Sequence, residues 1–395
     1  MSDPRPTLRI LASTEASPII ARGLSRRGFL SFTAAAGTTV FLAACTSPGG
    51  NANPGVQATG GPVESKLSIY SWGDYDEPDL LTEFTDTLGP AITLDSFSSN
   101  EEMISKLVAA RGTSGYDILV PTGPFIPQMV QNGLLTKLNL DLIPNISNMD
   151  PAFLGRDWDP GNDYSICKAW GTTGFVYDTT VITRDLLTWS DFIDAAQHEA
   201  SGKTSVLDDP GSMSGIYYWA NGIPWTTTDP ADLDALEAFM VNELAPHISA
   251  FDSYPGGSAI PQATQTLMQV WNGDARIGIQ ESPEPDRWRW VLGAPDTELW
   301  MDNWAIAAGA PHPEAAHAFI NFVLTPENSL RELAYIGYHT GGTGIEEAAR
   351  SENLDMLDLV FFTPEQIATM HTGEVTSVQG RVVDIWNKTK AAAGA

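Results

Sequence analysis

The segment that decides the fold is residues 66–121, KLSIYSWGDYDEPDLLTEFTDTLGPAITLDSFSSNEEMISKLVAARGTSGYDILVP. Three strand-like runs, at 67–72, 92–97 and 116–120, are separated by two stretches of helical periodicity. This order requires right-handed crossovers and predicts a parallel, doubly wound α/β sheet. Ligands bind beyond the carboxyl ends of such strands, at the segments that follow them here, 73–75 and 122–125.

A second α/β region is predicted after a loop rich in Asp, Asn and Pro at 141–163. Its expected strands are 174–177, 206–207 and 276–280. Helices are expected to begin at Ser190 and Asp229 and to cover 262–271, 313–324, 328–335 and 378–391. The 395 residues are therefore expected to form two domains, with no internal repeat.

The composition of the chain limits its partners. The formal charge is −28, and because residues 1–44 contain five Arg, one Asp and one Glu, the rest carries about −31. Nucleic-acid binding needs basic patches, so this charge argues against it. The acidity fits a protein that concentrates cations by its field, and equally a protein whose surface is acidic for solubility. Twelve tryptophans exceed ordinary core needs and are typical of ligand surfaces.

The N-terminal residues resemble an export and lipidation signal. Residues 25–30, SRRGFL, resemble a twin-arginine export signal, and an apolar segment too short to span a membrane follows. Its end, LAAC at 42–45, resembles a lipoprotein processing box, which predicts a signal peptide over 1–44, lipid on Cys45 and a tether over 45–63. With Cys45 lipidated, Cys167 has no partner for a disulfide and is expected to be a buried, small apolar residue.

Residues 298–307, ELWMDNWAIA, form another strand-like stretch with a carboxylate in its middle. Trp300 and Asp302 are two residues apart and so share one face of a pleated strand. A carboxylate beside an indole suits an organic cation, since one group neutralises the charge and the other attracts it through the ring quadrupole. Alternatively, Asp302 caps a local amide and the tryptophans belong to the core.

Other candidate motifs have structural alternatives. Asp208 and Asp209 end a strand, where Asp208 is expected to form a turn and Asp209 to project into the cleft. Trp271 is either a core residue at a helix end or part of the mouth of the second sheet. Tyr217 and Tyr218 suggest ferric-ion ligands only weakly, since tandem aromatics on a helix are more often core residues. No nucleophile elbow, phosphate loop or metal-ligand spacing is present, so neither an enzyme nor a cofactor nor a metal is predicted.

Six blocks, in order along nearly the whole mature chain, resemble the spermidine/putrescine-binding proteins of bacterial ABC importers: 69–75 (IYSWGDY), 115–121 (GYDILVP), 162–166 (NDYSI), 270–273 (VWNG), 299–302 (LWMD) and 336–338 (IGY). The resemblance implies a type II periplasmic-binding-protein fold, with two α/β lobes, each a doubly wound sheet, joined by hinge strands. We expect lobe 1 over 64–171 and 301–346 and lobe 2 over 172–300 and 347–395, with crossings near Gly171, Trp300 and Glu346.

The resemblance also implies the site and the partners. Aromatic walls would hold the methylenes of an amine and carboxylates its ammonium groups, which assigns ligand binding to Trp72, Tyr75, Asp209, Ser253, Trp271, Trp300, Asp302 and Tyr338. The expected partners are ABC permease and ATPase subunits, with the protein held by its lipid on the outer side of the cytoplasmic membrane or in the periplasm. Alternatives are a same-fold protein for an opine, a sugar derivative or ferric ion, and an envelope sensor without transport.

Three positions depart from the family pattern. Pro124 replaces a tyrosine, Ser212 a glutamate, and a position near Thr376 a glutamine. With Asp209 and Asp302 as the two firm anions, a third ammonium group would lack a counter-charge in a closed cleft. The sequence therefore predicts that a diamine such as putrescine is preferred over spermidine, and that Ser212→Glu favours spermidine.

Overall fold

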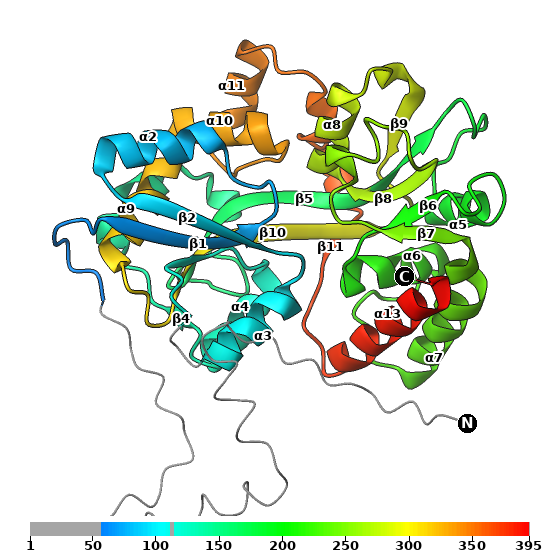
Figure 1. Cartoon of the computed structure of the whole chain (residues 1–395), viewed down its shortest axis with the longest axis horizontal. Helices are drawn as coiled ribbons and strands as arrows, with labels where there is room; N and C mark the ends of the chain where they lie inside the picture. Colours follow the sequence, from blue (N-terminus) through cyan, green and yellow to red (C-terminus); the bar gives the residue numbers. More distant parts are fainter. Residues whose placement is uncertain (1–56, 111–113, 395) are drawn as a thin grey trace, which may run out of the picture. The chain divides into compact units, whose positions relative to one another are not determined.

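The computed structural model describes residues 57–110 and 114–394 (Figure 1). The predicted export signal, Cys45 and most of the tether lie outside the described residues. Within the described ranges, no helix has the length and apolar character needed to cross a membrane.

The chain alternates strands and helices as the sequence predicts. The strands are β1 (Lys66–Trp72), β2 (Ala91–Phe97), β3 (Ile118–Leu119), β4 (Leu135–Thr136), β5 (Ser165–Asp178), β6 (Thr204–Val206), β7 (Ile248–Phe251), β8 (Leu267–Trp271), β9 (Trp288–Val291), β10 (Thr297–Ala307) and β11 (Met370–Thr372). The helices are α2 (Pro78–Leu88), α3 (Asn100–Ala110), α4 (Ile126–Gln131), α5 (Trp189–Gln197), α6 (Pro210–Asn221), α7 (Pro230–Phe239), α8 (Asn272–Glu281), α9 (Pro313–Val323), α10 (Pro326–Ile336), α11 (Ile345–Ser351), α12 (Pro364–Ile367) and α13 (Gln379–Ala393).

The first sheet confirms the predicted β-α-β-α-β unit. Strand β1 pairs in parallel with β2 on one side and β3 on the other, and β10 joins β3 in the antiparallel direction. Figure 1 shows α2 and α10 on one side of β1 and β2 and α3 and α4 on the other. Helix α2 ends at Gly89, whose φ of 100° lies in the left-handed region that glycine adopts without a steric penalty. The residues that follow the carboxyl ends of β1 and β3, Gly73 and Thr122, line a single cavity, which is described below.

Two long strands join the lobes. Strand β5 pairs with β10 through Thr172 and then, from Thr173 on, with β8 of the second sheet. The second sheet continues from β8 to β6 and β7, while β9 pairs with the far end of β5. Figure 1 shows β5 and β10 running side by side between the two groups of helices. The predicted arrangement of two α/β lobes connected by crossing strands is confirmed.

Separate cores stabilise the two lobes. One buried cluster includes Leu67, Ile118 and Phe319, and another includes Phe175, Trp189 and Ile216. Cys167 is buried in the first, as predicted, and its pKa is raised by burial. The first cluster also includes Trp72, Tyr75, Trp300 and Tyr338, and these side chains reach the space between the lobes.

The sequence prediction was wrong at Trp271. Residues 267–271 are a strand and 272–281 a helix, whereas a helix over 262–271 and a strand over 276–280 were expected. The apolar run Leu-Met-Gln-Val-Trp is buried between β5 and β6, and a run buried on both faces shows no strand periodicity. The third expected crossing, near Glu346, falls in helix α11, and β11 is a further segment that pairs with β10. The lobe boundaries stay a prediction.

Candidate functional site

A cavity of about 540 Å³ lies where the two lobes meet. Its walls come from the carboxyl ends of β1 and β3, from the first turns of α3 and α6, from β10, and from the segment before α13. Ten aromatic side chains line it: Trp72, Tyr75, Phe125, Tyr218, Trp225, Tyr254, Trp271, Trp300, Tyr335 and Tyr338. The cavity thus occupies the position expected for ligands of doubly wound sheets.

Seven of the eight predicted binding residues line this cavity: Trp72, Tyr75, Asp209, Trp271, Trp300, Asp302 and Tyr338. Ser253 does not line it, although the neighbouring Tyr254 does. The Ser253 side chain is buried, and its hydroxyl has no hydrogen-bond partner among the described residues. The three departures from the family pattern, Pro124, Ser212 and Thr376, also lie in the wall. Ligand binding by these side chains stays a prediction.

Strand β10 forms the floor of the cavity with one of its faces. Glu298, Trp300 and Asp302 alternate along it and all line the cavity, and the register with β5 is regular through Asp302. The face therefore presents a carboxylate, an indole and a second carboxylate in a row. Only Trp300 and Asp302 were predicted from the sequence, although the same alternation includes Glu298.

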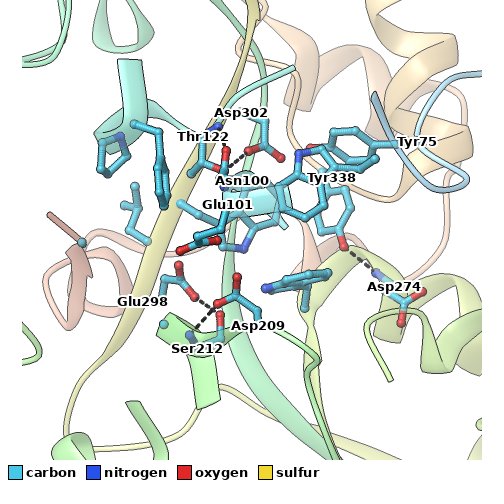
Figure 2. A pocket seen from close by; sticks show the side chains of 18 of the residues that line it. Tyr75, Asn100, Glu101, Thr122, Asp209, Ser212, Asp274, Glu298, Asp302 and Tyr338 are labelled. Atoms are coloured by element: carbon cyan, nitrogen blue, oxygen red, sulfur yellow. Dashed lines mark hydrogen bonds between the residues drawn. The ribbon is translucent and has the colours of Figure 1, made fainter. Parts of the chain in front are cut away.

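Asp302 is almost completely buried, at 6% exposure. Its Oδ1 accepts a hydrogen bond from the Thr122 hydroxyl at 2.7 Å, and Asn100 in turn donates to that hydroxyl at 2.9 Å (Figure 2). Burial raises the pKa of Asp302 to about 7, against the opposing effects of the Thr122 bond and of Lys168. This partner is a hydroxyl from another strand end rather than a local amide, so the capping alternative for Asp302 is wrong.

Lys168 does not neutralise Asp302 directly. Its ammonium group is fully buried and pairs with Asp76 at 2.9 Å and Glu332 at 2.8 Å. It also lies 4.7 Å from the ring centre of Tyr75, behind the cavity wall. This buried ion group thus contacts Tyr75 and does not line the cavity, whereas Asp302 does.

Glu298 is the second carboxylate on the floor. Its Oε2 accepts hydrogen bonds from the hydroxyls of Thr173 at 2.6 Å and Ser212 at 2.8 Å. Burial, and next the charge of Asp209, raise the pKa of Glu298 to about 7. The Ser212 backbone N–H also donates to Asp209 at 2.7 Å, so Ser212 touches both acids. The sequence-based count of two anions was therefore wrong, and the predicted preference for a diamine loses the argument on which it was based.

Further acids were missed from the sequence. Glu101, in the first turn of α3, accepts a hydrogen bond from Gln379 at 2.8 Å, and its pKa is raised to about 6 by burial and by Asp209. Asp274 accepts from the Gly256 N–H at 2.8 Å, and burial raises its pKa to about 8. Asp274 was missed because the sequence analysis expected a helix before Trp271, whereas the helix follows it and contains Asp274. Glu101 could not be found, because only the tertiary fold brings α3 to α6.

Aromatic rings form the remaining walls. Trp300 packs edge to face on Tyr338 at 4.8 Å between ring centres, and Trp72 on Trp271 at 6.0 Å. The indole N–H of Trp300 and the hydroxyl of Tyr75 are buried without a hydrogen-bond partner among the described residues. The indole N–H of Trp300 can only donate, so a bound molecule would have to offer it an acceptor, whereas the Tyr75 hydroxyl also acts on Asp302 and lowers the pKa of that acid.

The charge of the cavity has one sign. Eight carboxylic side chains line it: Asp74, Glu101, Asp209, Asp274, Glu281, Glu298, Asp302 and Glu374. Among the described residues that line it, none is Lys, Arg or His.

No metal site is evident in the part of the chain that the structure describes, because it contains no group of three or more His, Cys, Asp or Glu side chains arranged for a metal ion. Tyr218 lines the cavity, whereas Tyr217 packs against Phe239 at 5.0 Å.

Residues 79–357 match the family model described as bacterial extracellular solute-binding protein. The chain is a bacterial extracellular solute-binding protein. It is 30% identical over 287 residues to the spermidine/putrescine-binding periplasmic protein of Escherichia coli, covering 72% of this chain and 80% of that one. It is 26% identical over 347 residues to the putrescine/agmatine-binding protein of Pseudomonas aeruginosa, covering 83% of this chain and 92% of that one.

Solved structures place this solute-binding protein in the same fold. The spermidine/putrescine ABC transporter substrate-binding protein of Streptococcus pneumoniae superposes with a TM-score of 0.67 at 29% identity, covering 84% of this chain and 100% of that chain. The predicted type II periplasmic-binding-protein fold and the resemblance to polyamine-binding proteins are thus confirmed. The family is one of solute-binding proteins of transport systems.

Proposed function

We propose that this solute-binding protein captures a polyamine or a related organic cation between its two lobes and delivers it to the permease and ATPase subunits of an ABC importer. The observation that carries the proposal is the lining of the cavity, with eight carboxylic side chains and, among its described residues, no basic one. An anionic or neutral ligand would leave these acids uncompensated in a space of low dielectric.

The rest of the lining suits the apolar part of such a cation. Methylene groups pack on flat indole and phenol faces, and ammonium groups are attracted to the same faces. Carboxylates held by hydroxyl donors, as Asp302 is by Thr122 and Glu298 by Ser212, form charge-assisted hydrogen bonds with the ends. The names of the curated relatives, which bind spermidine, putrescine or agmatine, support the same ligand class.

The alternative ligands fit this lining less well. An opine carries carboxylates of its own and would need a basic partner in the wall, and a sugar derivative would leave the acids without counter-charge. Ferric ion was suggested by the tandem tyrosines, and of these only Tyr218 lines the cavity, whereas Tyr217 packs against Phe239. A sensor without transport would bind the same amine, so only uptake measured in cells separates it from an importer component.

For the localisation of the protein, we propose export through the twin-arginine route and anchoring by lipid on Cys45, on the outer side of the cytoplasmic membrane or in the periplasm. The support is Arg26-Arg27 before a short apolar segment and the small residues before Cys45. A lipid anchor would keep the binding protein close to its permease, which raises the effective concentration of the pair.

The proposal is tested by a thermal-shift screen of ligand-stripped protein against polyamines, amino acids, sugars, opines and Fe³⁺. A ligand that binds only the native state raises the melting temperature as its concentration exceeds Kd. Amines with two or more charges should give the largest shifts. Stabilisation by an opine or Fe³⁺ and none by any amine would contradict the proposed ligand class.

A further inference from the structure

The side chain of Tyr254 joins the two lobes at a distance from the strands that connect them. Tyr254 lies in the loop after β7, and its hydroxyl reaches two backbone groups of the first sheet. The N–H of Gly73, which follows β1, donates a hydrogen bond to this hydroxyl at 3.0 Å. The hydroxyl in turn donates to the carbonyl of Phe97, the last residue of β2, at 3.4 Å. Both bonds run from one lobe to the other between groups of the protein itself.

The strand order shows why these bonds depend on closure of the lobes. The strands follow one another in the order β2-β1-β3-β10-β5-β8-β6-β7, so that β2 and β7 stand at its two ends. Each is three strands away from the connecting pair β5 and β10, which is roughly 14 Å at about 4.8 Å per strand. A rotation of one lobe about the connecting strands would therefore carry Tyr254 away from Gly73 and Phe97.

The loop that carries Tyr254 is held by its own lobe. The Tyr254 N–H donates to the Asp252 carboxylate at 2.9 Å, and the Gly256 N–H donates to Asp274 of α8 at 2.8 Å. The tip of the ring fits closely against the first lobe, because a Cβ added at Gly73 would lie 3.2 Å from the Cζ atom of Tyr254. The hydroxyl is therefore presented at a fixed place, where only the closed arrangement of the lobes offers it both partners.

Two other hydrogen bonds cross between the lobes, but their side chains line the cavity. Gln379 of α13 donates to Glu101 of α3 at 2.8 Å, and the Asp274 N–H donates to the Tyr338 hydroxyl at 3.1 Å. A ligand in the cavity can compete for these groups. Tyr254 differs, because its ring lines the cavity while its hydroxyl is engaged by backbone groups.

We propose that the Tyr254 hydroxyl is an interlobe latch, which stabilises the closed arrangement and so raises the affinity for every ligand by the same factor. The inference rests on the proposed function, since an amine is the ligand whose binding reports closure. The latch adds to the stabilisation that the ligand supplies and does not keep the lobes closed alone. Tyr254 is then a residue that determines affinity rather than specificity.

Population arithmetic gives the expected effect. The apparent Kd equals the intrinsic Kd divided by the fraction of protein in the binding-competent state. Removing the latch lowers that fraction by the factor that its hydrogen bonds contribute, roughly three- to tenfold for a net contribution typical of such bonds. The loss should appear in the dissociation rate, because the ligand enters before the lobes close and escapes when they open.

The test compares wild type with Tyr254→Phe, which keeps the ring and removes only the hydroxyl. Ligand-stripped proteins are titrated by calorimetry with putrescine, spermidine and agmatine, which differ in length and end groups. All three affinities should fall by roughly three- to tenfold and by a common factor, with faster dissociation in stopped-flow fluorescence. Tyr164→Phe is the matched control. Tyr164 does not line the cavity, and its ring lies 5.5 Å from the exposed Lys137, so the affinities should change by less than about twofold.

Hydrogen exchange tests the latch without a variant. In wild type, saturating putrescine should slow exchange at the Gly73 amide, which donates to the Tyr254 hydroxyl, and Tyr254→Phe should lose this protection while β1 keeps its own. Unchanged affinities in Tyr254→Phe, or Gly73 exchange that putrescine does not alter, would overturn the latch and leave amine binding intact. A loss confined to one amine would also overturn it, since the hydroxyl would then contact that ligand. A wild type that binds no amine would overturn the proposed function and this inference with it.

Discussion

Replacing Asp302 by Asn should weaken amine binding and, at the same time, stabilise the ligand-free protein at alkaline pH. The side chain is 6% exposed, and burial raises its pKa from 3.8 to about 7. Ionising this acid therefore costs the native state more than the unfolded chain. Asparagine has the same shape and never ionises, so the variant avoids the cost.

The pH window follows from these two values. Between pH 3.8 and about 7 the native state binds the proton that the unfolded chain has lost, so the free energy of unfolding falls as the pH rises through this window. One pKa unit corresponds to about 1.36 kcal/mol, which gives a full penalty of about 4 kcal/mol above pH 7. Between about pH 5 and pH 8, the wild type should lose about 2–3 kcal/mol more stability than Asp302→Asn.

The assay is urea unfolding of both proteins at about pH 5 and pH 8, after refolding from denaturant to remove amine carried through purification. The same samples, titrated with putrescine at pH 8, should show an affinity lower by roughly ten- to a hundredfold in the variant, as expected for one charge-assisted hydrogen bond. Asp296→Asn, which removes an acid next to β10 that is 42% exposed and paired with His371, should follow the wild type in both measurements. Parallel stability curves for wild type and Asp302→Asn would refute the argument that the buried charge of Asp302 is kept for the ligand.

Three further outcomes are expected. First, putrescine binding at about pH 6.5 should release protons, because the raised pKa values of Glu101, Glu298 and Asp302 leave part of each acid protonated until the cation enters. The affinity for putrescine should therefore rise from about pH 5.5 to about pH 8. A binding enthalpy that is the same in buffers of different ionisation enthalpy would argue against this proton release. Second, Gly171→Ala should lower both melting temperature and amine affinity, since an added Cβ would lie 2.6 Å from the Trp300 ring and against Asn272; wild-type binding in this variant would mean that Trp300 is free to move. Third, Cys45→Ser should leave the protein unprocessed or mislocalised, and replacing both Arg26 and Arg27 by Lys should stop export; normal anchoring in fractionated cells would show that the proposed address is wrong.

Local pattern was sufficient to predict much of the fold. Apolar alternation and capping residues around α2 and α3 predicted the first sheet, in which β1 has one regular parallel partner on each side. The same reasoning failed at β8, whose residues are buried on both faces and so lack a period. A strand that pairs in two sheets, such as β5, has its length and partners determined by tertiary contacts, and the periodicity of the sequence carries no information about those contacts.

The site was predicted where it follows from neighbours in sequence. Trp300 and Asp302 share a strand face, and Asp209 follows a strand end, so all three could be assigned to the site from the sequence. Glu298 belongs to the same face and could have been included by extending the alternation by two residues. Glu101 meets Asp209 only because two lobes come together, and no spacing in the chain indicates that contact.

The central claim, that the cavity holds an organic cation by its charges, is tested most directly by one calorimetric comparison. Ligand-stripped wild type is titrated at pH 8 with putrescine and with its neutral counterpart 1,4-butanediol, which matches it in length and hydrogen-bonding ends. The account predicts that putrescine binds with an affinity at least a hundredfold higher, since each lost ammonium–carboxylate bond costs about tenfold or more. Equal affinities, or binding of neither molecule, would contradict it.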